Sequence, residues 1–521
     1  MTKEKRFTIQ IALIVALGGF LMGFDASVIS GVVKFIEPEF HLSKLELGWS
    51  VSSLTLMATL AMMVAGPLSD AVGRKKLLKY AAILFAISAI GSAFAPTFLT
   101  LVIARMIGGI GVGAALILAP MYIAEVSPPS MRGQMVSFNQ LNIVLGISVA
   151  FFTNYMILKL GESSAPWALS LKFDEWNWRW MLGLETLPAI LYYLGLFLVP
   201  ESPRWLVMKN REDEARKIMQ KITSEEDAQH QIEAVHNSLL DNIKHEKVPL
   251  GELFKPALRL VLTIGIVVAI LQQITGINSV FFYAPMIFEQ SGIGTDASFV
   301  QSILVGLTNL VFTVMAILMI DKLGRKPLLG FGVAGIAVCM FLLSYGFHIA
   351  TYKLTHESLQ SLSKQLNTEN LEPLVGKSFE SDIAFKNAVI AALGEEHGKQ
   401  YESEIITASI TMNPTLILFG ILGFVASFAI SIGPVMWVLF SELFPNRIRG
   451  VAISFVGLIN SGVSFLVQLI FPWELSHFGN SFTFLIYGIF AVLGLAFILL
   501  KVPETKGKSL EELESILVKE H

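Results

Sequence analysis

The sequence has few charged residues for its length. Aspartate, glutamate, lysine and arginine make up only 15% of the 521 residues, whereas soluble proteins average about 25%. Hydrophobic residues reach 54% and are gathered in long runs, which is typical of a chain that crosses a lipid bilayer. The low charge therefore excludes an ordinary soluble protein.

Other residue types and motifs that are scarce or absent exclude further classes of protein. Cys339 is the only cysteine, so the chain has neither a disulfide framework nor a cysteine-ligated zinc site. The net charge of -3 leaves no basic surplus for a nucleic-acid partner. The sequence also lacks a nucleotide-binding loop and a cluster of metal-binding residues. We therefore expect no enzyme, no metal and no organic cofactor.

Twelve apolar runs predict twelve transmembrane helices, because each is close to the about 20 residues that a helix needs to cross a bilayer. With the amino terminus in the cytoplasm, most lysine and arginine residues fall on cytoplasmic segments, which predicts that both termini are cytoplasmic. The spans are expected at about 7–33, 49–68, 77–95, 98–123, 135–158, 180–200, 257–289, 297–320, 328–350, 413–440, 450–472 and 481–502.

Two charged motifs occur once in each half of the chain. Asp-x-x-Gly-Arg-Lys begins at Asp70 and again at Asp321, and Glu-x-x-Pro-x-x-x-Arg-Gly begins at Glu125 and again at Glu442. A duplicated six-span unit is typical of transporters whose two bundles rock about a central site. The sequence therefore predicts an all-α membrane protein made of two pseudo-symmetric six-helix bundles.

The expected domain organisation follows from this repeat. The linker should carry short surface helices at about 210–221 and 225–240, where charge and helical periodicity coincide. The insertion is expected to be a solvated, partly helical cap, with capture of a substrate or partner as the alternative. The parts are an amino-terminal bundle at 1–200, a cytoplasmic linker at 201–256, a carboxyl-terminal bundle at 257–502 with an extracytoplasmic insertion at about 351–410, and a cytoplasmic tail at 503–521.

The motifs together resemble the sugar porter branch of the major facilitator superfamily. Besides the two repeated loops, the resemblance rests on Pro200-Glu-Ser-Pro-Arg204, Gln272-Gln-Ile-Thr-Gly-Ile-Asn278 and Pro503-Glu-Thr-Lys-Gly507. It is strongest with proton-coupled pentose and hexose symporters of bacterial type, the xylose and glucose symporters. The resemblance implies the major facilitator fold and protons as the coupling ion. The insertion has no counterpart in the family pattern.

Three ionisable residues fall well inside predicted spans rather than near their ends, roughly 8–12 Å from the outer end at 1.5 Å per residue. Such groups are costly in a bilayer and are usually functional. A carboxylate beside an arginine suits a proton switch and a static ion pair equally well. In the family, an aspartate at the position of Asp25 marks proton symporters. The resemblance therefore implies that Asp25 carries the proton, that Arg105 is its charge partner and that Glu185 is a candidate second relay residue.

Amide side chains inside spans suit a sugar, because they both donate and accept hydrogen bonds. Taken alone, each amide is equally well explained by a hydrogen bond between helices, and Trp437 is better explained by packing than by contact with a ligand. Thr275-Gly276 is expected to break the seventh span and open backbone groups to a cavity, and Gly433-Pro434 is expected to be a hinge. The resemblance implies sugar contacts from Gln140, Gln272, Gln273, Asn278, Asn309 and Trp437.

The charged residues of the repeated loops have two readings. They are either positive-inside anchors or a cytoplasmic latch of arginine–carboxylate bonds that break and form again between two conformations. The family pattern favours a latch that is closed when the transporter faces outward. Its expected members are Asp70, Arg74, Glu125, Arg132, Asp321, Arg325, Glu442 and Arg449.

The expected function is proton:monosaccharide symport by alternating access, carried out by a monomeric, multi-pass protein of the plasma (inner) membrane. Its partners are then a monosaccharide and the lipid bilayer. Ile147, and Ser461 after Asn460, depart from the family pattern, so the sugar stays open. The alternatives are a facilitator without proton coupling, a polyol or inositol symporter, and a drug exporter of the same superfamily.

Overall fold

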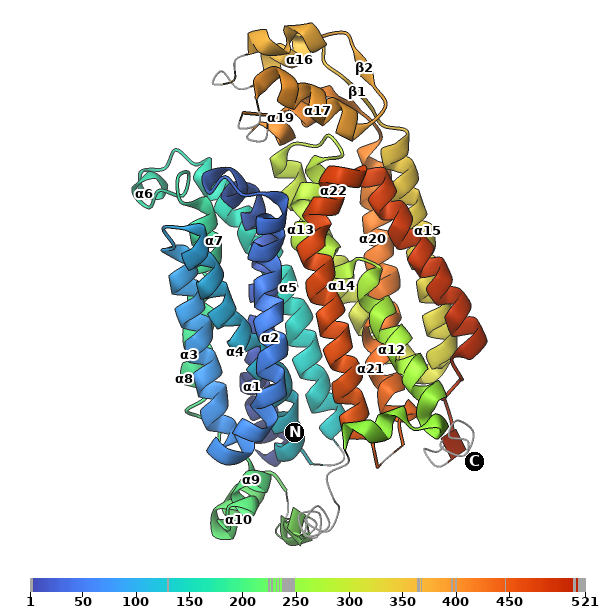
Figure 1. Ribbon diagram of the computed structural model, residues 1–521. Helices are drawn as coiled ribbons and strands as arrows, with labels where there is room; N and C mark the ends of the chain where they lie inside the picture. Colours follow the sequence, from blue (N-terminus) through green and yellow to red (C-terminus); the bar gives the residue numbers. More distant parts are fainter. Residues whose placement is uncertain are drawn as a thin grey trace. The chain divides into compact units, whose positions relative to one another are not determined.

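The computed structural model describes most of the chain, and most of the described residues are helical (Figure 1). By their contacts they form two units. The first comprises Met1–Val28, Ser53–Ala150 and Arg179–Pro249, and the second comprises Ile29–Ser52, Phe151–Trp178 and Leu250–His521. The described residues are 3–508 and 512–513, with gaps at 129–130, 224, 226–227, 231, 234, 237–248, 363–365, 367, 395–396, 399–400 and 446.

Long apolar helices dominate both halves of the sequence. The long helices of the amino-terminal half are α1 (Lys3–Glu39), α2 (Lys44–Val72), α3 (Arg74–Ala93), α4 (Phe98–Val126) and α5 (Arg132–Gly161). Three short helices follow them: α6 (Pro166–Ser170), α7 (Asn177–Gly183) and α8 (Thr186–Gly195). The apolar helices of the carboxyl-terminal half are α12 (Arg259–Ile274), α13 (Ile277–Glu289), α14 (Thr295–Leu323), α15 (Arg325–His348), α20 (Pro414–Ile430), α21 (Ile432–Leu443) and α22 (Arg449–Lys501).

Small residues allow the helices of the first unit to approach closely. Gly109 and Gly113 of α4 lie against the backbone carbonyls of Leu54 and Ala58 in α2, where a Cβ would come within 2.4 Å and 2.2 Å. Glycine is the residue that permits such contact between membrane helices. The core of this unit is formed by apolar side chains of α1, α3, α4 and α8, among which Tyr192 is fully buried.

Ten helices among the described residues are long and apolar enough to cross a membrane. One of them, α22, has 53 residues. At 1.5 Å per residue it would be about 80 Å long, whereas the hydrocarbon core is only about 30 Å thick. Gly479 interrupts it with φ 77° and ψ 168°, between the two spans predicted at 450–472 and 481–502.

Two further spans are interrupted. Between α12 and α13, Gly276 has φ +88°, which confirms the break expected at Thr275-Gly276; glycine adopts this conformation without strain. Between α20 and α21 the break lies at Ser431, with φ −124° and ψ −104°. The expected hinge at Gly433-Pro434 is therefore wrong by two residues, because α21 already begins at Ile432 and its first turn tolerates the proline.

The residues expected to form the sixth span are helical in two pieces. α7 ends at Gly183 and α8 begins at Thr186. Each piece is shorter than a bilayer requires, so neither is among the ten long helices. Glu185 lies in the interruption and is 2% exposed. Gly183 and Pro188 flank the break. Pro188 lies in the first turn of α8, and it lacks the N–H that a continuous helix would donate to the Leu184 carbonyl.

The insertion, residues 351–411, is a small folded domain rather than a merely solvated cap. β1 (Thr351–Lys353) pairs antiparallel with β2 (Ser378–Phe379) and β3 (Ile410–Thr411) in a sheet of order β2-β1-β3. The insertion has its own apolar core, in which Tyr352 stacks on Phe385. The helical elements are α16 (His356–Ser361), η3 (Thr368–Leu374), α17 (Asp382–Leu393) and α19 (Glu402–Ser409). In Figure 1 the insertion lies where α15 ends and α20 begins.

The linker is partly described. It carries α9 (Pro203–Met208) and α10 (Glu212–Met219), followed later by η1 (Leu250–Phe254) and η2 (Pro256–Leu258). α10 agrees with the helix expected at 210–221. Much of the second expected helix, at 225–240, lies outside the described residues.

Candidate functional site

A buried ion pair connects two helices of the first unit. Asp25 of α1 and Arg105 of α4 are each 1% exposed, and Arg105 Nη1 lies 3.4 Å from Asp25 Oδ1. Gly108, one turn along α4, provides room for the carboxylate, since a Cβ there would lie 2.7 Å from Asp25 Oδ2. Asp25 Oδ2 has no hydrogen-bond partner among the described residues. One oxygen of the carboxylate therefore pairs with the arginine, whereas the other accepts no hydrogen bond from a described residue.

Glu185 belongs to the same charged group. It interacts electrostatically with both Asp25 and Arg105, and its Oε1 has no hydrogen-bond partner among the residues described. The three residues come from α1, α4 and the break between α7 and α8. The group therefore consists of two buried carboxylates and one buried guanidinium.

A network of amides lies at the break of α12 and α13 in the second unit. The Gln272 Nε2 group donates to the carbonyls of Ile432 and Gly433, each at 3.2 Å. Gln273 Nε2 donates to Gln272 Oε1 at 3.2 Å and to Asn460 Oδ1 at 3.1 Å. These bonds connect α12 to the α20–α21 break and to α22, so the network lies where backbone groups leave the regular helix.

The network continues along α22. Asn278 Nδ2 donates to Gln273 Oε1 at 2.8 Å and to Ser464 Oγ at 2.6 Å. Gln468 Nε2 donates to the same Ser464 hydroxyl at 2.8 Å. Asn460, Ser464 and Gln468 were not among the predicted site residues. Their spacing of four residues places them on one face of α22, and this polar stripe in an apolar span is the signal that could have revealed them.

Asn309 and Trp437, two predicted sugar contacts of the same unit, form no hydrogen bond with this network among the described residues. Asn309 of α14 is 6% exposed and Trp437 of α21 is 47% exposed. Trp437 packs edge-to-face on Phe440 with ring centroids 6.0 Å apart. Gln140 lies on α5 in the first unit and is exposed. Of the six, Gln272, Gln273 and Asn278 are therefore brought together.

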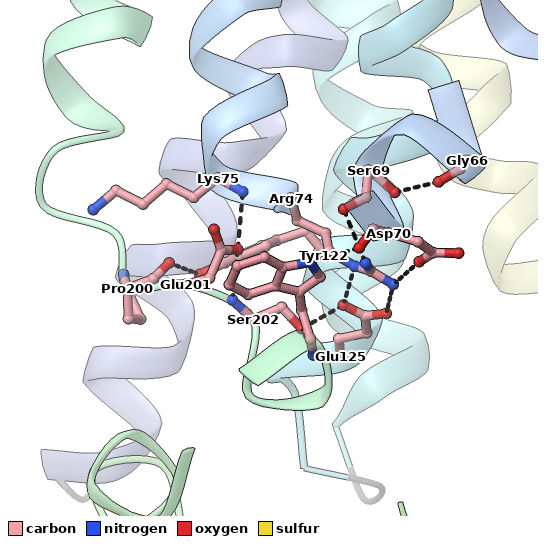
Figure 2. A network of polar contacts seen from close by, with 11 residues as sticks. Gly66, Ser69, Asp70, Arg74, Lys75, Tyr122, Glu125, Pro200, Glu201 and Ser202 are labelled. Atoms are coloured by element: carbon pink, nitrogen blue, oxygen red, sulfur yellow. Dashed lines mark hydrogen bonds and ion pairs between the residues drawn. The ribbon is translucent and has the colours of Figure 1, made fainter. Parts of the chain in front are cut away.

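The motif residues of the first unit form a compact charged cluster at the junction of α2 and α3 (Figure 2). Arg74 Nη2 lies 2.7 Å from Asp70 Oδ1, and Arg74 Nε lies 3.2 Å from Glu125 Oε2. Ser202 donates to Glu125, and the Glu201 carboxylate accepts the backbone N–H of Lys75 at 3.0 Å. The ends of α2 and α4 thus meet at Arg74, and the segment after α8 joins them through Glu125 and the backbone of Lys75.

The second unit repeats this arrangement. Arg325 Nη2 lies 2.8 Å from Glu442 Oε1, and Thr505 Oγ1 donates to Glu442 Oε2 at 2.6 Å. Glu504 accepts the backbone N–H groups of Arg325 and Lys326, each at 3.1 Å. Burial raises the pKa of the Glu504 carboxyl, but its backbone N–H donors together outweigh burial and hold the pKa below its usual value.

The remaining predicted latch residues behave differently. Arg449 donates to the Phe444 carbonyl at 3.1 Å rather than to a carboxylate, and Arg132 is exposed at the first residue of α5. The side chain of Asp321 lies outside the described part of the structure. The carboxylates that were missed are Glu201 and Glu504, although the repeated Pro-Glu-Ser and Pro-Glu-Thr sequences could have indicated them.

Comparison with known proteins identifies the family. Residues 11–366 and 397–517 match the family described as "Sugar (and other) transporter". The arabinose-proton symporter of Bacillus subtilis (strain 168) is 36% identical over 514 residues, covering 98% of this chain and 96% of that protein. The D-xylose-proton symporter of Escherichia coli (strain K12) is 35% identical over 544 residues, with coverage of 98% and 96%.

Solved structures agree. The inward open conformation of the xylose transporter XylE from E. coli matches with a TM-score of 0.74 at 33% identity, covering 98% of this chain and 100% of that one. XylE bound to 6-bromo-6-deoxy-D-glucose matches with a TM-score of 0.68 at 34% identity, covering 99% and 100%. The family resemblance seen in the sequence is thereby confirmed. The expectation that the protein is a transporter rather than an enzyme is confirmed as well. The chain belongs to the sugar transporter family of the major facilitator superfamily and is a multi-pass protein of the plasma membrane.

Proposed function

We propose that the protein is a proton:monosaccharide symporter that works by alternating access. The observation that carries this proposal is the buried Asp25–Arg105 pair, in which one carboxylate oxygen has no hydrogen-bond partner among the described residues. A facilitator has no need for a charge inside the membrane, where its burial is costly. The names of the arabinose-proton and D-xylose-proton symporters support protons as the coupling ion.

The proton cycle uses the two states of Asp25. While Arg105 holds the carboxylate, the charged form is favoured; when the pair separates, the buried carboxylate takes up a proton, because an isolated charge there is unstable. Glu185 interacts with both groups and is the second relay residue. Arg105 keeps its charge throughout, because a guanidinium is not deprotonated in proteins.

The sugar site is built on the amide network. Gln272, Gln273 and Asn278 hold each other through hydrogen bonds that a sugar hydroxyl can replace without leaving a buried amide unpaired. Asn309, Gln140 and Trp437 are kept as proposed sugar contacts on the family pattern alone. Monosaccharides suit these groups, since hydroxyls both donate and accept. The names of the relatives favour a pentose, while the XylE complex with a glucose analogue keeps hexoses as candidates.

The path of the chain through the bilayer follows from the helix breaks. If α22 crosses the membrane twice, with its turn at Gly479, and α7 and α8 together form one crossing, the ten long helices give twelve crossings. Both termini are then in the cytoplasm. The bundles are 1–200 and 257–502, joined by the linker at 201–256. The clusters around Arg74 and Arg325 fasten the cytoplasmic loops within each bundle and act as the latch. The protein functions as a monomer.

Proteoliposomes test the function directly. Radiolabelled D-xylose, L-arabinose, D-glucose and myo-inositol are offered with and without an inward proton gradient. Accumulation above the outside concentration that collapses with a protonophore is expected for at least one monosaccharide. Uptake that only equilibrates, whatever the gradient, would identify a facilitator instead. Selective accumulation of myo-inositol would identify a polyol symporter.

A further inference from the structure

The insertion domain (residues 351–411) is firmly fixed to carboxyl-terminal helices of its own unit. Asp382, the first residue of α17, accepts the backbone N–H and the side-chain amide of Asn480, both at 3.1 Å. A Cβ at Gly479, the break in α22, would lie 2.5 Å from Asp382 Oδ1. Ile410 of β3 packs on Gly292 after α13, where a Cβ would lie 2.4 Å from Ile410 Cγ2. The domain must therefore move together with these helices.

A chain of alternating charges leads from this domain to the start of α2. Glu402 of α19 lies 3.1 Å from Lys386 of α17, and its other oxygen lies 3.8 Å from Lys44, the first residue of α2. Lys44 in turn donates to Glu37 of α1 at 2.6 Å. The four side chains are between 11% and 21% exposed. They are thus partly shielded yet within reach of water.

The Lys44–Glu402 contact belongs to a belt of contacts within the second unit. The outer ends of α1, α2 and α5 contact α13, α14 and α22 there, and Gly48 of α2 lies against the backbone of Leu469. The belt consists of Lys34–Glu289 at 2.5 Å, Lys159–Asp296 at 2.5 Å and the Trp49–Phe465 rings with centroids 5.8 Å apart.

We propose that the insertion domain is an outer clamp of the transport cycle. It is mounted on α13, α15 and α22, and it holds the first turn of α2 through Lys44 and Glu402 while the outer ends of the helices are together. When they part, the two charges separate into water. Partly exposed ion pairs contribute little net stability, so such a contact forms and breaks readily. The clamp rests on the proposed transport function.

Cross-linking tests the clamp. In a Cys339→Ser background, Lys44→Cys/Glu402→Cys is treated with a short bis-maleimide that contains a reducible disulfide. The cross-link should reduce sugar counterflow to the background level, and reduction should restore it. Lys386→Cys/Glu402→Cys is the matched control: it shares Glu402 and joins two positions within the domain. This control should cross-link equally well and continue to transport.

Two results would overturn the clamp. One is full counterflow in Lys44→Cys/Glu402→Cys after complete cross-linking. The other is a cross-link yield below a tenth of that of Lys386→Cys/Glu402→Cys, because the contact then does not form. The yield is measured by mass spectrometry of membranes without sugar. It therefore decides the contact even if the parent protein transports none of the sugars tested, an outcome that would refute the proposed function alone.

A milder variant supplies the energetic test. Glu402→Gln keeps the shape of the side chain and removes its charge, and it should favour the conformation with the outer ends apart. The apparent KM for sugar added outside should fall by up to about fivefold, the shift expected for a partly exposed ion pair. An unchanged or raised KM contradicts the clamp. Glu357→Gln, elsewhere in the domain, should leave the KM at the parent value.

Discussion

Replacement of Asp25 by asparagine tests the proton site most directly, because it keeps the shape of the side chain and removes its charge. Arg105 then remains charged in a site that is 1% exposed. At 3.4 Å and an effective dielectric constant of about 20, the lost attraction is roughly 5 kcal/mol. Removal of one partner of a buried pair costs about 3–5 kcal/mol. Since whole proteins are stable by about 5–15 kcal/mol, the variant should fold with a lowered Tm.

The transport result is expected to be sharper than the stability result. A gradient of one pH unit supplies about 1.4 kcal/mol per proton, so one proton per sugar supports up to about tenfold accumulation. Asp25→Asn cannot release a proton at this site, and its accumulation ratio should fall to about one. Exchange of labelled for unlabelled sugar should continue, because it needs no net proton movement.

The assay compares proteoliposomes with equal amounts of protein, in parallel with thermal unfolding in detergent. Asp174→Asn, the same change at an exposed loop position, is the control and should accumulate sugar like the parent. Accumulation by Asp25→Asn close to the parent level would refute the assignment of the proton to Asp25. Loss of exchange together with accumulation would instead indicate a structural role for the pair.

Three further predictions concern other sites. Gln272→Ala should raise the KM for the transported sugar about five- to tenfold at equal surface expression, since one hydrogen bond is worth roughly 1–1.5 kcal/mol; an unchanged KM in an uptake assay would remove it from the sugar site. Because the pKa of Glu504 is lowered, its stabilisation is present above the unfolded pKa of about 4.3 and is lost as the pH falls through the folded pKa. Glu504→Gln should therefore lower the Tm at neutral pH and flatten its decline in acid, and a Tm–pH curve parallel to that of the parent would contradict this. Gly276→Ala should lower the Tm, because alanine at φ +88° costs about 1–2 kcal/mol and its Cβ would lie 2.5 Å from the Tyr487 ring; Gly450→Ala, with open space around it, should not.

Much of the helical fold could be predicted because apolar runs of sufficient length have few alternatives to a membrane helix. The break at Gly276 was also predictable, since Thr-Gly interrupts a run that carries amides. The break at Glu185 was missed, although Gly183 and Pro188 beside it are residues that interrupt a helix. The sheet of the insertion was equally hidden: strands of two or three residues have no detectable period.

The candidate site was predictable where residue chemistry and membrane depth agree. Asp25 and Arg105 stood out as charges in apolar spans, and the structure pairs them. Ser464 and Gln468 did not, because polar residues in a span usually bond to a neighbouring helix. The carboxylates that bind backbone N–H groups, Glu201 and Glu504, were hidden for another reason: sequence patterns indicate charge pairs more readily than bonds to the main chain.

The pairing of β1 with β3 brings the two ends of the insertion domain together. Thr351 lies opposite Thr411, so the chain leaves α15 and returns to α20 at a single point. The length of the segment between β1 and β3 hardly affects the helices, because the two paired strands close the loop. The entropic cost of closing a loop rises only slowly with its length. The segment between the two strands can therefore be exchanged for a reporter domain while the ends of α15 and α20 stay where they are. Such an exchange removes the Asp382–Asn480 contact with α22.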